Sequence, residues 1–103
     1  MIADFEKVIA VPDLAPGSCM EAVVGGRSVA LFNVGGSFYA IGNSCIHRGG
    51  PLGQGMLEGH TVMCPWHAWT YDVTTGISTV NDSLRVPKYD VKVEDGQVYV
   101  KVD

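Results

Sequence analysis

The sequence predicts an all-β domain built of many short antiparallel strands. Thirteen glycines are spread over 103 residues, and several of them stand in pairs that suit two-residue hairpin turns. Val, Ile, Tyr and Phe, which favour strands, fill the segments between those turns. No window of about 11 residues holds apolar positions at helical spacing without a glycine or proline inside it.

The N-terminal half is predicted to form consecutive hairpins. Gly25-Gly26 and Gly35-Gly36 each separate two apolar segments, and glycine adopts the positive φ of such turns without steric cost. The strands expected before and around these turns are 5–11, 20–24, 27–34 and 37–41.

The C-terminal end carries the strongest hairpin signal in the chain. Valines alternate with polar residues on both sides of Asp95-Gly96, and Tyr89-Asp90-Val91 lies in the first of the two strands. The preceding segment, 84–87, is interpreted as the start of that strand, after a loop at 81–83.

Length and charge limit the functions to consider. We expect one domain spanning residues 1–103. Seven Lys and Arg against 11 Asp and Glu give a net charge of −4, and the basic residues stand singly, so nucleic acid is not an expected partner. The acidic first residues lack the basic start and apolar run of a secretory signal; we expect no membrane association and a cytoplasmic location.

The middle of the chain carries two Cys/His pairs. Cys45-Ile46-His47 is followed, after 16 residues, by Cys64-Pro65-Trp66-His67. Two such pairs on loops between strands can bring four soft or borderline ligands to one metal site. Only one cysteine, Cys19, and one histidine, His60, lie outside the pairs.

Three interpretations of these pairs are open at this point. Each could be a buried thiol beside a structural histidine. A zinc-stabilised binding module is the second, although zinc sites usually pair cysteine with cysteine and histidine with histidine. Mixed pairs suit two adjacent metal ions, with Cys45 and Cys64 on one ion and His47 and His67 on the other.

The blocks at 45–52 and 64–69 resemble the two cluster-binding loops of the Rieske [2Fe–2S] family, in which two histidines replace two cysteines on one iron. The resemblance implies an antiparallel fold of three small sheets with one cluster at a tip, held by loops at about 43–52 and 64–69. The implied ligands of the cluster are Cys45, His47, Cys64 and His67.

The resemblance also indicates a low reduction potential within the family. Respiratory members carry a disulfide between the loops, but the matching positions here hold Gly50 and Trp66. Trp69 replaces a serine that hydrogen-bonds to sulfur, whereas Tyr71 matches a tyrosine that does so. Because such hydrogen bonds stabilise the more negative reduced cluster, fewer of them predict the low end of about −150 to +300 mV.

The expected function is that of an electron carrier rather than an enzyme. After the four ligands only His60 remains, so no second, oxygen-activating iron can be built, and no nucleotide-binding glycine motif is present. By resemblance, the chain relays electrons from an NAD(P)H-dependent flavin reductase to a terminal ring-hydroxylating oxygenase, or serves as the small partner of a nitrite reductase. We expect a monomer without a small-molecule substrate. The expected docking residues are Arg48, Gly49, Gly50, Pro51, Pro65 and Trp66.

Four further residues receive structural interpretations. Cys19 is expected to be a small buried side chain of a strand, and His60 a solvated loop residue. Met20 and Met63 are expected in the core.

Overall fold

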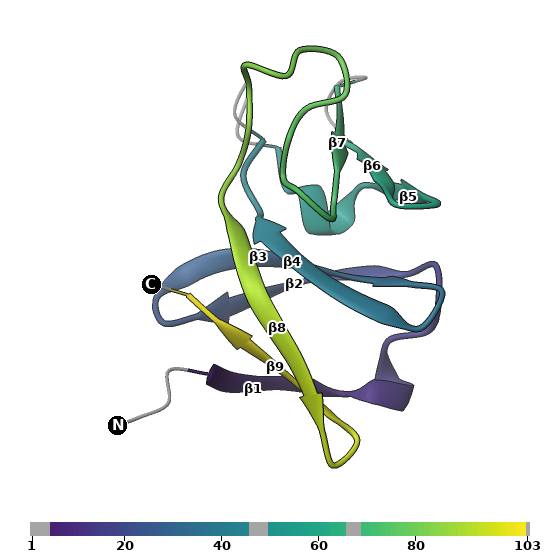
Figure 1. Ribbon diagram of the computed structural model, residues 1–103, viewed down its shortest axis with the longest axis vertical. Helices are drawn as coiled ribbons and strands as arrows, with labels where there is room; N and C mark the ends of the chain where they lie inside the picture. Colours follow the sequence, from purple (N-terminus) through teal and green to yellow (C-terminus); the bar gives the residue numbers. More distant parts are fainter. Residues whose placement is uncertain (1–4, 46–49, 66–68, 103) are drawn as a thin grey trace.

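The computed structural model describes residues 5–45, 50–65 and 69–102. Nine strands form two antiparallel sheets over these residues (Figure 1). The large sheet has the order β1-β9-β8-β4-β3-β2 and the small one β5-β6-β7. The strands are β1 (Phe5–Ala10), β2 (Cys19–Val24), β3 (Arg27–Val34), β4 (Ser37–Gly42), β5 (Met56–Glu58), β6 (Thr61–Met63), β7 (Thr70–Asp72), β8 (Lys88–Glu94) and β9 (Gln97–Lys101).

The predicted hairpins are confirmed. Gly25 and Gly26 have φ of 58° and 80° at the β2–β3 turn, and Asp95 and Gly96 have φ of 53° and 75° at the β8–β9 turn. The only helical segments in the described part of the chain are two single 3₁₀ turns, η1 (Val11–Asp13) and η2 (Leu52–Gln54). None of these is long or apolar enough to cross a membrane.

The number of sheets differs from the three implied by the resemblance. Strands β4 and β8 pair through Ala40 with Tyr89 and Ile41 with Lys88, which joins two three-stranded units into the six-stranded sheet. The strand expected to start within 84–87 begins only at Lys88. Arg85 instead makes an isolated bridge to Ile77 within the long connection between β7 and β8.

Two buried cores lie on opposite faces of β3 and β4. The hydrocarbon core fills the interior of the large sheet and consists of Leu14, Val24, Val29, Leu31, Ala40, Val98 and Val100. The cysteine-containing core lies between β3, β4 and the small sheet and consists of Ala30, Phe32, Ile41, Cys45, Leu52, Val62, Cys64, Tyr71, Val73 and Val86. Because β3 contacts both cores, residues 29–33 are all buried.

Cys19, Met20 and Met63 were expected to be buried. Cys19 and Met20 are half-buried in β2 and pack against the cores. Met63 contradicts the expectation, because its side chain is 42% exposed. In β6 the neighbouring Val62 points into the cysteine-containing core, and strand alternation turns Met63 outward beside Met56.

Candidate metal centre

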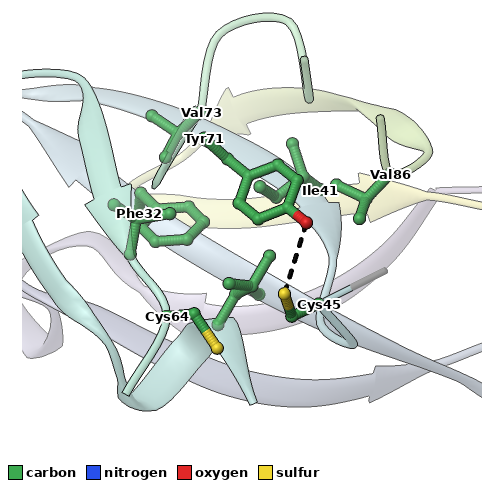
Figure 2. Packing of buried hydrophobic residues seen from close by; sticks show 10 residues of the cluster. Phe32, Ile41, Cys45, Cys64, Tyr71, Val73 and Val86 are labelled. Atoms are coloured by element: carbon green, nitrogen blue, oxygen red, sulfur yellow. Dashed lines mark hydrogen bonds between the residues drawn. The ribbon is translucent and has the colours of Figure 1, made fainter. Parts of the chain in front are cut away.

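Cys45 lies on the segment that follows β4. This residue is 2% exposed, and its backbone N–H donates to Gly50 O at 2.9 Å, which holds residues 45 and 50 together. Its Sγ lies 3.3 Å from the hydroxyl oxygen of Tyr71, a fully buried residue of β7 (Figure 2). The segment after β4 therefore supplies the first cysteine, and β7 of the small sheet supplies a polar group directed at its sulfur.

Cys64 follows β6 and is also 2% exposed. Its backbone N–H donates to Trp69 O at 2.9 Å, which holds residues 64 and 69 together in the same manner. Both cysteines belong to the cysteine-containing core, as the close view of its side chains shows (Figure 2). The fold thus brings together two thiols that are 19 residues apart in sequence (64 − 45).

The remaining predicted residues are placed in part. His47, Arg48, Gly49, Trp66 and His67 lie outside the described residues. Gly50 is buried, Pro51 and Trp69 are half-buried, and Pro65 is exposed. His60, expected to be solvated, has a side chain that is 61% exposed.

The described residues fit an iron–sulfur cluster. Thiolates are the ligands that such clusters prefer, and two of them here share one apolar core that excludes bulk water. When sulfur is bound to iron as thiolate it can only accept, so the Tyr71 hydroxyl donates to Cys45 Sγ. That hydrogen bond offsets negative charge on the sulfur.

Asp72 fixes the turn that follows β7 and Tyr71. The backbone N–H and hydroxyl of Thr74 donate to Asp72 Oδ1 at 2.9 and 2.6 Å, and His60 Nδ1 lies 3.3 Å from the same oxygen. Burial alone would raise the pKa of Asp72, but the hydrogen bonds from Thr74, together with His60, outweigh it and lower the pKa. The carboxylate therefore stays ionised and holds the end of β7.

Residues 4–90 match the profile of the Rieske [2Fe-2S] domain. The chain belongs to the Rieske [2Fe–2S] family. The predicted cofactor, one Rieske [2Fe–2S] cluster, and the predicted all-β Rieske-like fold are thereby confirmed, and the zinc alternative is excluded. When bound, this cluster accepts and releases a single electron.

Single-domain ferredoxins of this Rieske family align with the chain almost from end to end. The chain is 33% identical over 96 residues to ferredoxin CarAc of Metapseudomonas resinovorans, covering 91% of this chain and 90% of the relative. It superposes on the ferredoxin of carbazole 1,9a-dioxygenase from Nocardioides aromaticivorans with a TM-score of 0.92, 31% identity and coverage of 98% and 100%.

A third similar protein was solved in a complex of reduced oxygenase and oxidised ferredoxin in carbazole 1,9a-dioxygenase. Its similar chain gives a TM-score of 0.87 at 32% identity, covering 95% of this chain and 93% of that one.

The sequence interpretation overlooked Asn43 and Glu21, which form a hydrogen bond two residues before Cys45. Asn43 stands two positions before Cys45, inside the predicted loop at 43–52, whereas Glu21 is a polar residue on a strand of the large sheet. The only sequence signal for a role of Asn43 was its position shortly before a predicted ligand. Nothing in the sequence indicates a role for Glu21.

Proposed function

We propose that this chain is the ferredoxin component of an aromatic-ring dioxygenase system and delivers single electrons to the terminal oxygenase. The observation that carries the proposal is its end-to-end similarity to ferredoxins of such systems, including one solved in complex with its oxygenase. A single Rieske domain of 103 residues stores one electron and carries it between larger proteins.

The proposed ligands are Cys45 and Cys64 on one iron and His47 and His67 on the other. Two observations support the two cysteines as ligands. Both thiols are buried in one core, and the backbone N–H of each cysteine donates a hydrogen bond, to Gly50 O or to Trp69 O. His47 and His67 are supported as ligands because each follows a cysteine by two or three positions.

Finer features of the function extend this proposal. A flavin reductase that uses NAD(P)H supplies the electron in the cytoplasm, and the chain acts as a single-domain monomer, residues 1–103, without a small-molecule substrate. Both partners dock briefly on Arg48, Gly49, Pro51, Pro65 and Trp66, and a small contact suffices for transient electron transfer. Gly50, also expected to take part in docking, is buried and is left out of this contact. Among the docking residues, the exposed Pro65 lies directly after Cys64.

Electron delivery to the oxygenase is tested by mixing purified proteins. The protein is reduced anaerobically, mixed with the terminal oxygenase of a carbazole dioxygenase, and oxygenase reduction is followed by its absorbance. We expect stoichiometric one-electron transfer. Transfer to a nitrite reductase but not to any ring-hydroxylating oxygenase would overturn the proposed partner.

The low-potential assignment is tested by a redox titration at pH 7. We expect a midpoint in the lower part of the family range of about −150 to +300 mV. A midpoint potential well above that of the standard hydrogen electrode would contradict the low-potential assignment. The reason is that this chain has Trp69 where a sulfur-bonding serine stands in high-potential members.

A further inference from the structure

Asn43 makes more hydrogen bonds than a surface turn residue needs. The residue is 6% exposed. Its Nδ2 donates to Glu21 Oε2 at 2.8 Å and to Ser28 Oγ at 3.0 Å, and its Oδ1 accepts from the backbone N–H of Gly53 at 2.7 Å. One side chain therefore joins three separate segments: β2, β3 and the η2 turn.

The backbone of Asn43 extends the same junction. Its N–H donates to Ser28 O at 3.1 Å, and its carbonyl accepts from Leu52 N–H at 2.6 Å. Towards Cys45, Ser44 bridges Pro51, and Cys45 N–H donates to Gly50 O at 2.9 Å. Residues 43–45 thus pair with residues 50–52 through backbone contacts, and Asn43 makes the pair farthest from the segment between Cys45 and Gly50.

Glu21 anchors this junction to the large sheet. Its carboxylate accepts from Asn43 and, at 2.9 Å, from Gln54 Nε2 in η2. These hydrogen bonds, from Asn43 and then Gln54, lower the pKa of Glu21, so the acceptor is charged and the bonds are stronger than neutral ones. A Cβ at Gly53 would lie 2.6 Å from Glu21 Cγ, which shows how closely η2 packs on β2.

The η2 turn also positions the second cysteine. A Cβ at Gly55, directly after η2, would lie only 2.2 Å from Met63 O, and Met63 precedes Cys64. Asn43 therefore fixes η2 relative to Cys45, and the close approach of Gly55 fixes η2 relative to Cys64.

We infer that Asn43 is a positioning residue for the iron–sulfur cluster: by clamping η2 to β2 and β3, it sets the placement of the Cys45 segment relative to Cys64. The inference rests on the proposed ligation by these two cysteines. Asn43 acts through the chain that carries them and not by contact with the cluster. Loss of the Asn43 hydrogen bonds lets the cluster release iron more readily and changes the protein environment of the reduced cluster.

The test compares Asn43→Ala with Asn33→Ala. Asn33 is a matched control because it is also buried, at 3% exposure, donates to Leu14 O at 2.7 Å and accepts from Gly36 N–H at 2.8 Å. It holds the turn between β3 and β4 instead of the cysteine segments. Holoprotein of each variant is examined by EPR after dithionite reduction, by redox titration, and by the rate of iron release to a chelator.

We expect Asn43→Ala to change the EPR g values and midpoint potential and to release iron about tenfold faster than the wild type, because buried groups lose their partners. Asn33→Ala should keep wild-type g values, potential and release rate even where its melting temperature falls. Equal spectra, potentials and release rates for the two variants would overturn the inference.

Glu21→Ala keeps the inference testable if Asn43→Ala does not fold, because residue 21 is exposed. Its control is Glu6→Ala, which removes a carboxylate that accepts from Gly25 N–H at 3.2 Å in the large sheet. We expect faster iron release for Glu21→Ala only; equal rates for both variants would contradict the clamp.

Cys45→Ser separates failure of the clamp from failure of the proposed ligand set. If Cys45→Ser retains the wild-type spectrum, the ligand assignment is wrong and the inference fails with it. If Cys45→Ser loses the cluster while Asn43→Ala behaves as the wild type, only the positioning role is wrong.

Discussion

The two sheets of this Rieske protein differ in what stabilises them. The large sheet has strands of five to eight residues around a core made only of hydrocarbon side chains. Each strand of the small sheet has three residues, near the lower limit for a strand, and its inner face packs on a core that includes Cys45 and Cys64. The large sheet therefore has an apolar core of its own, whereas the small sheet is attached through η2 and, under the proposed ligation, through Cys64 as a metal ligand.

This difference predicts that cluster binding and local folding are coupled in the small sheet. Metal ligation contributes to the folding free energy of the segments that carry the ligands. The large sheet closes its hydrocarbon core without residues of β5, β6 or β7, and only one face of β3 and β4 contacts the cysteine-containing core. We therefore expect the large sheet to depend less on the cluster than the small sheet does.

Loss of the cluster should produce the largest difference in stability between the two sheets. In Cys64→Ser we expect the visible absorption of the cluster to disappear and the amides of β5–β7 to lose protection from hydrogen exchange. The amides of β3 should remain protected, since residues 29–33 are buried between the cores. Hydrogen exchange resolved by residue checks this, and an equal loss of protection in both sheets would show that they unfold as one unit.

Gly55→Ala should weaken the attachment of the small sheet strongly. The added Cβ would lie 2.2 Å from Met63 O and 2.9 Å from Val62 Cγ2, so backbone must move. We expect a loss of about 3 kcal/mol or more in the free energy of unfolding and a lower iron content.

The control is Gly59→Ala, in the turn between β5 and β6. Gly59 has φ of +62° with no atom within 4 Å of an added Cβ, so only backbone strain of about 1 kcal/mol applies. Denaturant unfolding and iron analysis of both variants provide the measurement; similar losses would mean that close packing at Gly55 is unimportant.

Tyr71→Phe probes the contact between the sheets at the metal centre itself. Removing the hydroxyl 3.3 Å from Cys45 Sγ takes away a hydrogen bond that stabilises the reduced state, so the midpoint potential should fall. The shift equals the difference in strength of this bond between the two redox states, so a bond worth about 0.5 to 1.5 kcal/mol sets an upper limit of about 20 to 65 mV for one electron. Redox titration against Tyr89→Phe, in β8 of the large sheet, checks the direction; a higher potential would contradict it.

The sequence predicted the large sheet better than the small one, because its signals are local. Glycine pairs and Asp95-Gly96 mark turns between adjacent strands, and those hairpins formed as expected. The pairing of β1 with β9 and the short junction of β4 with β8 join distant segments, and no local pattern specifies them.

In the small sheet, three-residue strands are too short for alternation to be read, which explains why Met63 was wrongly assigned to the core. The paired Cys/His motifs predicted that Cys45 and Cys64 bind one metal ion; both lie in the cysteine-containing core, and their ligation stays a proposal. Asn43 was overlooked because its role depends on Glu21 and Gly53, which only the folded chain brings to it.

Asp72→Asn should give the smallest effect, confined to the turn after β7. The pKa of Asp72 is lowered in the folded protein, so the ionised carboxylate stabilises the fold above the unfolded pKa of about 3.9, and this contribution is lost as pH falls through the folded pKa. We expect Asp72→Asn to cost less than about 1 kcal/mol at pH 7, since the amide oxygen still accepts from Thr74.

The difference in unfolding free energy between the wild type and Asp72→Asn should shrink below about pH 4. Denaturant unfolding followed by far-UV circular dichroism at stepped pH measures it, and acid loss of the cluster, common to both proteins, cancels in the difference. A difference that instead widens below about pH 4 would mean that Asp72 is more stabilising when protonated. In that case the hydrogen bonds from Thr74 and the contact with His60 do not outweigh burial, and the end of β7 is held by its backbone alone.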